Sequence, residues 1–291
     1  MSFIAFFQTN PTAFIIVVSM IGLLVGSFLN VVIYRLPIMM EREWKSQCCE
    51  LLEQDNPTKE TQRTFNLSKP RSRCPNCNHA ITALENIPIV SYLIQGGQCK
   101  GCGDKISVRY PVVELMTAIL TAIVAWRFGF GWPAFGGIVL TWALITLSGI
   151  DFDTQLLPDS ITLPFLWLGI AFNLFFAAYT DLASSVIGAM AGYLSLWSVY
   201  WLFKLVTKKE GMGYGDFKLL GLIGAWLGWE VLPLTIILSS VAGAVIGVSL
   251  IMFKSHGRET PIPFGPYLAI AGWIALCWGQ DLTNLYLGSL H

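Results

Sequence analysis

A succession of long apolar segments constrains this chain more than any other feature. A membrane-spanning helix needs roughly 20 mostly apolar residues, because the hydrocarbon core of a bilayer is about 30 Å thick. Hydrophobic residues make up 54% of the 291 positions and charged residues only 12%, a balance that a soluble domain of this length cannot bury. We therefore expect an all-α polytopic membrane protein with about eight transmembrane helices, at residues 12–34, 111–128, 132–150, 160–179, 183–206, 217–229, 231–253 and 265–288.

The sixth of these segments is unusually short. Its apolar stretch after Asp216 reaches only Trp229, because Glu230 and Pro233 follow. A segment of this length must be tilted, shielded from lipid by protein, or merged with its neighbour.

The basic residues predict the orientation of the chain in the membrane. Eleven Lys and Arg residues lie in 35–109, four in 204–218 and two in 254–258, so seventeen of the eighteen share one face and only Arg127 lies opposite. Cytoplasmic loops retain positive charge, so this face is predicted to be cytoplasmic. The net charge is zero, and the sparse basic residues argue against a nucleic-acid partner.

The same pattern predicts three parts. Residues 1–36 form the first transmembrane helix, residues 37–110 a cytoplasmic loop domain, and residues 111–291 a membrane-embedded domain. Within the loop, residues 40–70 are polar and indicate a short amphipathic helix followed by a linker, whereas residues 71–109 hold two cysteine pairs and several turn residues.

The cysteine pairs predict a zinc-ribbon-like insertion. Cys74 and Cys77 form one CxxC motif, and Cys99 and Cys102 form another after a spacer of 21 residues. Four thiolates can close a tetrahedron around one ion, which is the geometry of a structural Zn²⁺ rather than a catalytic one. A thioredoxin-like redox pair is the alternative, but two such motifs without a βαβ setting do not favour it. For Cys48, Cys49 and Cys277, packing or chance is the simpler interpretation.

Four acidic residues lie at the predicted membrane boundary. Asp151, Asp153 and Asp159 crowd the end of the third segment, and Asp216 opens the sixth. An acid beside hydrocarbon is costly to desolvate and by default indicates function. Asp216 could also be only a helix cap, and Asp153 and Asp159 could be wetted turn residues. Two glycines just before Asp216 permit a close backbone approach, which favours the functional interpretation. Paired carboxylates can hydrolyse an amide.

At this point the residues resemble a known family. The run Gly213-Tyr-Gly-Asp216 resembles the GxGD signature of intramembrane aspartyl proteases, and Asp151 followed by Leu157-Pro-Asp159 is similar to the companion motif of type IV prepilin peptidases. The resemblance to the bifunctional prepilin leader peptidases and N-methyltransferases of Gram-negative bacteria covers nearly the whole chain. It also includes the CxxC loop, Gly26-Ser-Phe-Leu-Asn30, Val31 to Pro37, and Pro261-Ile-Pro-Phe-Gly-Pro266.

This resemblance implies two reactions at the cytoplasmic face of the inner membrane. The family cuts a short basic leader from prepilins and from the pseudopilins of type II secretion, and then methylates the new N-terminal amine with S-adenosylmethionine. By position, Asp151 and Asp216 are the expected catalytic pair, and the four CxxC cysteines hold zinc. Asp153 and Asp159 are expected to be supporting or capping acids.

The methyl-donor site and the cofactor-binding residues are not specified by any Gly-rich fingerprint. By resemblance the methyl-donor site should involve the loop, around 85–91 and 95–97, where a plain turn is an equal alternative. Three rival interpretations are a proton-coupled transporter, a structural scaffold, and a peptidase without methyl transfer.

Overall fold

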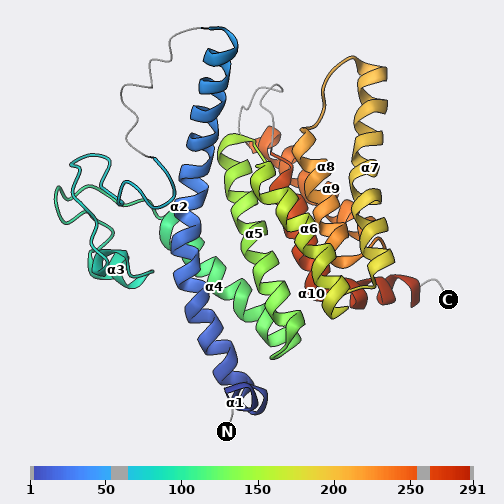
Figure 1. Cartoon of the computed structure of the whole chain (residues 1–291), viewed down its shortest axis with the longest axis horizontal. Coiled ribbons are helices and arrows are strands. Elements are labelled where there is room, and N and C mark those ends of the chain that lie inside the picture. Colours follow the sequence, from blue (N-terminus) through green and yellow to red (C-terminus); the bar gives the residue numbers. More distant parts are fainter. Residues whose placement is uncertain (1–2, 54–64, 254–262, 289–291) are drawn as a thin grey trace. The chain divides into compact units, whose positions relative to one another are not determined.

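The computed structural model describes residues 3–53, 65–253 and 263–288. Within them the chain is helical, and its only β pairing is two isolated bridges, Arg73 with Ala80 and Gln98 with Lys105. All eight predicted helices are present (Figure 1). They are α2 (Pro11–Leu51), α4 (Arg109–Phe128), α5 (Trp132–Thr154), α6 (Asp159–Phe176), α7 (Leu182–Thr207), α8 (Tyr214–Leu227), α9 (Leu232–Phe253) and α10 (Gly265–Gly288), with the short α1 (Phe3–Thr9), η1 (Leu84–Asn86) and α3 (Val90–Ile94) besides.

Six of the described helices are long and apolar enough to cross a bilayer, namely α2, α4, α5, α6, α7 and α9. The prediction of an all-α polytopic membrane protein is therefore confirmed. The chain is a multi-pass membrane protein.

Two compact units make up the chain, and we describe each by itself: residues 1–126, called unit 1, and residues 127–291, called unit 2. The division into 1–36, 37–110 and 111–291 that the sequence predicts stays a prediction.

The first predicted helix is longer than the sequence suggested. A membrane helix ending at residue 34 and a separate polar helix after residue 40 were expected, but α2 is one continuous helix of 41 residues with Pro37 inside it. At 1.5 Å per residue it is about 60 Å long, twice the hydrocarbon thickness, so its polar end must leave the membrane. Pro37 removes one backbone hydrogen bond, and the turns on either side continue the helix.

Small residues let α2 and α4 approach closely in unit 1. A Cβ atom on Gly22 would lie 3.0 Å from Cα of Ala118, and one on Gly26 would lie 2.8 Å from Cα of Glu114. Two glycines four residues apart form the small-xxx-small pattern that brings membrane helices together. The buried Asn30 adds a hydrogen bond of 3.1 Å from its Nδ2 to the carbonyl of Tyr110.

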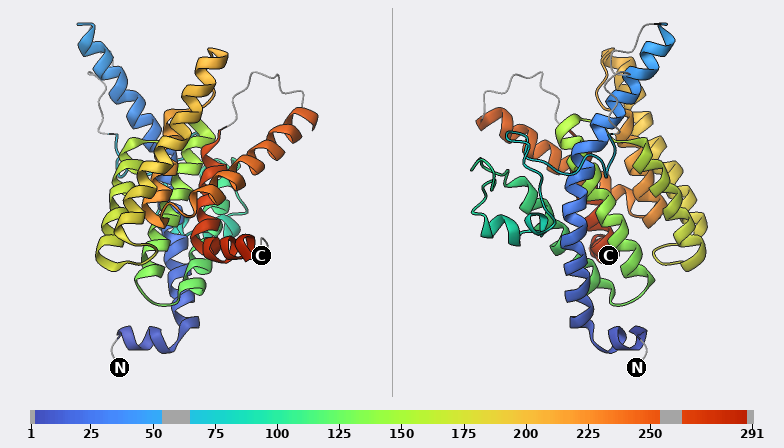
Figure 2. Two further views of the ribbon diagram at one scale, coloured as in Figure 1. Left: turned by 90° about the vertical axis from the view of Figure 1, so that its right-hand side faces the viewer. Right: turned by 60° about the vertical axis from the view of Figure 1, so that its left-hand side comes forward.

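The core of unit 2 is α8, which packs against α6, α7 and α10 (Figure 2). Phe217 and residues 219–227 of this helix are all buried. Trp226 is fully buried, donates from its indole nitrogen to the Phe165 carbonyl at 2.8 Å, and stacks on Phe172. With 14 residues, α8 is only about 21 Å long. Of the three explanations for its shortness, shielding by protein is the one that the structure supports.

The helix α9 is packed least. Only 17% of its apolar window is buried, compared with 61% for α5. It leaves the remainder of unit 2 at an angle (Figure 2). Its exposed valines therefore form a surface suited to lipid, as expected for a helix at the periphery of a membrane-embedded bundle.

Candidate active site and metal centre

The four CxxC cysteines come together in unit 1. Their sulfur atoms all lie within 4.8 Å of one another, with 3.8 Å between Cys74 and Cys102 and 3.9 Å between Cys77 and Cys99. A regular tetrahedron with metal–sulfur distances of about 2.3 Å has sulfur–sulfur edges of about 3.8 Å. The cluster therefore has the size and the donor set to hold a metal ion, and Cys48, Cys49 and Cys277 are not part of it.

Both cysteine pairs have the same backbone design. The amide of Cys74 donates to the His79 carbonyl at 3.0 Å, and the amide of Cys99 donates to the Asp104 carbonyl at 2.8 Å, five residues on in each case. The fifth residue of each turn, Asn78 or Gly103, has a positive φ and donates back to the first cysteine. In each CxxC motif this turn therefore directs the two cysteine sulfur atoms to the same side of the backbone.

Hydrogen bonds favour the ionised form of the first cysteine. The backbone amides of Cys77 and Asn76 lower the pKa of Cys74 to about 7. A thiolate is the form of cysteine that binds metal. Burial and the neighbouring thiols raise the pKa of Cys102 to about 12, so among these two cysteines only Cys74 is readily ionised without a metal.

Glu85 stabilises the segment that follows the first CxxC motif. Its carboxylate accepts a hydrogen bond of 2.9 Å from the Thr82 amide, which lowers the pKa of Glu85 to about 2 with help from His79. Its other contacts are His79 at 3.3 Å and Lys100, which lies between Cys99 and Cys102, at 3.5 Å. One carboxylate therefore links both halves of the cysteine-rich region.

The predicted catalytic acids lie in unit 2, on two different helices. Asp151 is inside α5, one turn before its end at Thr154 rather than beyond the helix as the sequence suggested, and Asp216 is the third residue of α8. Both are buried, with 5% and 7% of their surfaces exposed. Burial of both acids is the first requirement of a carboxylate pair that shares a proton.

The start of α10 holds Asp151. The backbone amide of Gly265 donates to Oδ2 of Asp151 at 3.0 Å. Leu157, from the connection between α5 and α6, lies against both Gly265 and Gly215, which precedes Asp216. Leu157 thus packs between the elements that carry the two acids.

Asp159 and Asp153 are placed differently from the pair. Asp159 is the first residue of α6, and its carboxylate pairs with Lys218, two residues after Asp216, at 2.6 and 2.7 Å. Asp153 is exposed. Supporting roles for these two acids, rather than catalytic ones, stay a prediction.

Sequence reasoning missed Lys218 and Gly265. Lys218 lies two residues after Asp216 in α8, and side chains two residues apart in a helix do not face each other, so this spacing gave no signal. Gly265 belongs to the motif at 261–266, of which residues 261 and 262 lie outside the described residues. No local pattern assigns either residue to its acid.

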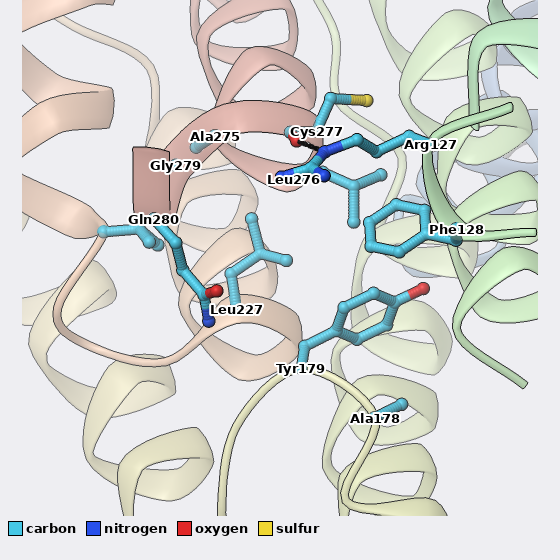
Figure 3. Close-up of a pocket in the computed structure, with 11 residues that line it drawn as sticks. Arg127, Phe128, Ala178, Tyr179, Leu227, Ala275, Leu276, Cys277, Gly279 and Gln280 are labelled. Carbon is cyan, nitrogen blue, oxygen red and sulfur yellow. Dashed lines mark hydrogen bonds between the residues drawn. The ribbon is translucent and has the colours of Figure 1, made fainter. Parts of the chain in front are cut away.

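Unit 2 also contains a cavity of about 140 Å³, whose lining residues are drawn in Figure 3 and include neither Asp151 nor Asp216. Its wall includes Tyr179, whose hydroxyl donates to the carbonyl of Pro133 at the beginning of α5. Asp151 is 18 residues further along this helix, about 27 Å away. The cavity is also lined by Arg127, Phe128, Leu227, Cys277 and Gln280.

Comparisons with known proteins agree with both units. Residues 20–128 match the "Bacterial Peptidase A24 N-terminal domain" and residues 138–248 match the "Type IV leader peptidase family". A protein of Stutzerimonas stutzeri named prepilin leader peptidase/N-methyltransferase is 57% identical over 284 residues, covering 98% of this chain and 97% of that protein.

Proteins with the same name from other bacteria are also similar to this chain. One from Aeromonas salmonicida (strain A449) is 55% identical and covers 96% of each chain, and one from Neisseria gonorrhoeae is 52% identical and covers 88% of this chain and 87% of its own. No solved structure matches the chain. From the paired buried acids, the cysteine cluster and these full-length similarities, we conclude that the chain belongs to the type IV leader peptidase family.

Proposed function

We propose that this protein removes the leader peptide from type IV prepilins and type II secretion pseudopilins and then methylates the new N-terminal residue. Relatives named for both reactions are more than half identical to it over nearly their whole length. The observation that carries the proposal is the pair of buried acids, Asp151 and Asp216, which Leu157 connects by lying beside both Gly265, the partner of Asp151, and Gly215, the residue before Asp216.

Asp151 and Asp216 would act as one catalytic pair with a shared proton. The ionised carboxylate takes a proton from a water molecule, whose oxygen then bonds to the scissile carbonyl carbon, while the protonated partner gives its proton to the carbonyl oxygen. The tetrahedral intermediate collapses when a carboxyl group returns a proton to the amide nitrogen and the carbon–nitrogen bond breaks. Burial of both side chains excludes bulk water and strengthens these charge interactions.

The cysteine cluster would bind a structural Zn²⁺ through Cys74, Cys77, Cys99 and Cys102. With four protein ligands the ion has no open position for a substrate. Its contribution would be folding free energy for a region that has little hydrophobic core of its own. Of the described residues 65–108, only Cys74 and the residues at 88 and 97 are buried, which supports this assignment.

We assign methyl transfer to unit 1, with S-adenosylmethionine as the donor of the methyl group. The leader peptidase family matches only residues 138–248, in unit 2, so the second activity needs another part of the chain. Residues 85–91 and 95–97 remain the candidate segments. Gly96 and Gly97 both have positive φ. Gly96 is exposed and a Cβ there would meet nothing within 4 Å, whereas Gly97 is buried against Tyr92.

The inner membrane, with the acids at its cytoplasmic face, is the proposed location. Seventeen of eighteen basic residues are predicted to lie on that face, and Arg127 is the exception. Arg127 lines the cavity at the opposite end of α5 from Asp151, which supports this orientation. Acids near helix ends also favour a peptidase over a proton-coupled transporter, whose acids would lie at the bilayer midplane.

The test uses the purified full chain, a prepilin and labelled S-adenosylmethionine, and follows leader loss and label transfer separately. We expect Asp151→Asn and Asp216→Asn each to abolish leader loss, while a synthetic substrate that already lacks its leader still receives label. Leader loss at the wild-type rate in either variant would refute the catalytic assignment. A wild type that trims but never transfers label would identify a peptidase without methyl transfer.

A further inference from the structure

Gly265 is the first residue of α10, and its amide is directed at the carboxylate of Asp151. The amides in the first turn of a helix have no acceptor within the helix. The next residue, Pro266, has no amide hydrogen, and the amide of Tyr267 donates to the Phe264 carbonyl at 3.1 Å. Gly265 therefore supplies the free amide of this turn, and Asp151 accepts it at 3.0 Å in a buried contact.

The carboxylate of Asp151 also leaves no room for a side chain at residue 265. A Cβ atom there would lie 2.6 Å from Oδ2 and 3.1 Å from Cγ of Asp151. The φ angle of Gly265 is one that any residue can adopt, so the backbone conformation does not require glycine. Any larger residue must displace the carboxylate of Asp151, and that carboxylate is the reason for glycine at this position.

We propose that Gly265 is a positioning residue for leader cleavage, which sets the orientation of Asp151 through its amide and through its lack of a side chain. This inference rests on the proposed function. It also extends the candidate site to the start of α10, beyond the residues 138–248 that match the peptidase family. The positive end of the α10 dipole adds to the hydrogen bond in holding the carboxylate.

The first experiment compares Gly265→Ala with Gly272→Ala in the full-length enzyme. A Cβ on Gly272 would lie 2.6 Å from Cδ1 of Ile223, so the control makes an equally close contact in the same helix without touching Asp151. We expect Gly265→Ala to lower kcat for leader cleavage by about 100-fold and to change KM by less than about threefold, because a small misplacement of a reacting group has such an effect. Gly272→Ala should stay within about threefold of wild type in both parameters.

A second variant removes the amide and keeps the space. Replacing Gly265 with glycolic acid turns its amide into an ester, and this amide makes no hydrogen bond within the helix. We expect kcat to fall by about tenfold, since one hydrogen bond to a charged group is lost. Methyl transfer to a substrate that already lacks its leader should be unchanged in all these variants, which shows that unit 1 is folded, and thermal unfolding in detergent at the wild-type temperature shows the same for unit 2.

The outcomes separate this inference from the proposed function. If Asp151→Asn abolishes cleavage while Gly265→Ala and the ester variant both cleave at the wild-type rate, the role of Gly265 is disproved and the catalytic pair stands. If Asp151→Asn itself cleaves normally, the proposed function fails first. Equal losses in Gly265→Ala and Gly272→Ala, with a wild-type ester variant, would indicate packing of α10 instead.

Discussion

Lys218 and Asp159 form an ion pair that joins the second residue after Asp216 to the first residue of α6, with Nζ 2.6 and 2.7 Å from the two carboxylate oxygens. The side chains are 26% and 55% exposed, so solvent screens the pair. An interaction of this kind contributes at most about 1 kcal/mol to stability. Its position beside Asp216 is therefore of more interest than its strength.

We expect Lys218→Met to lower the rate of leader cleavage roughly tenfold, because the start of α8 loses its tether to α6 and Asp216 is oriented less well. Thermal unfolding in detergent should show a loss of stability of less than about 1 kcal/mol. The reversed pair, Asp159→Lys with Lys218→Asp, should recover most of the activity lost in either single variant. A reversed pair as slow as the single variants would show that the pair does not orient α8.

Removal of the metal should destabilise the cysteine-rich region of unit 1. A wild-type chain is expected to hold about one zinc ion, and Cys74→Ser to hold substantially less, since three thiolates leave the tetrahedron open. The free energy of zinc binding is folding free energy for such a site, so the region 65–108 should become sensitive to protease when a chelator is added. Elemental analysis and limited proteolysis measure both effects. Cys48→Ser is the matched control, and a metal content that fell equally in both variants would contradict the assignment.

Packing between α2 and α4 should depend on Gly26. A Cβ at this position would lie 2.8 Å from a backbone atom of Glu114, which cannot move without moving α4. We expect Gly26→Ala to destabilise the protein by about 1–3 kcal/mol, as overpacking does. Met20→Leu, on the exposed side of α2, serves as the control and should unfold at the wild-type temperature. Unchanged unfolding of Gly26→Ala would mean that the helices separate easily at this point.

Replacement of Arg127 is expected to leave leader cleavage nearly unchanged. Its guanidinium donates to the Cys277 carbonyl at 2.7 Å and pairs with Asp281 at 2.6 Å, beside the cavity at the far end of α5 from Asp151. Because this end lies about 27 Å from Asp151 along the helix, we expect Arg127→Gln to cleave prepilin within about twofold of the wild-type rate. Steady-state kinetics check this, and a large loss of kcat would show that the two ends of unit 2 are coupled.

The sequence predicted what depends on local pattern. Apolar runs predicted the eight helices and their order, although among the described residues only six of these are long and apolar enough to cross a membrane. The short run after Asp216 correctly indicated an unusual helix, because length and hydrophobicity are properties of a segment itself. The spacing of Cys74, Cys77, Cys99 and Cys102 predicted a cluster, since CxxC turns converge sulfur atoms by geometry. The continuation of α2 through Pro37 was missed, because proline often ends a helix, whereas here the helix continues on both sides of it.

The contacts between distant residues could not be predicted in this way. Gly265 and Asp151 are 114 residues apart, and Lys218 and Asp159 are 59 apart. Neither pairing leaves a periodic signal, because each follows from how α5, α6, α8 and α10 pack. The candidate acids could be chosen from motifs, whereas the contacts of Asp151 with Gly265 and of Asp159 with Lys218 required the fold.

The enclosure of α8 has a consequence for the environments in which this enzyme can work. A helix that meets lipid along its length responds to bilayer thickness by tilting or bending. Here neighbouring helices surround the helix that bears Asp216, so a thicker or thinner bilayer would strain that outer ring first and leave the alignment of the acids nearly unaltered. Cleavage rates should thus vary little across vesicles whose lipid tails differ in length.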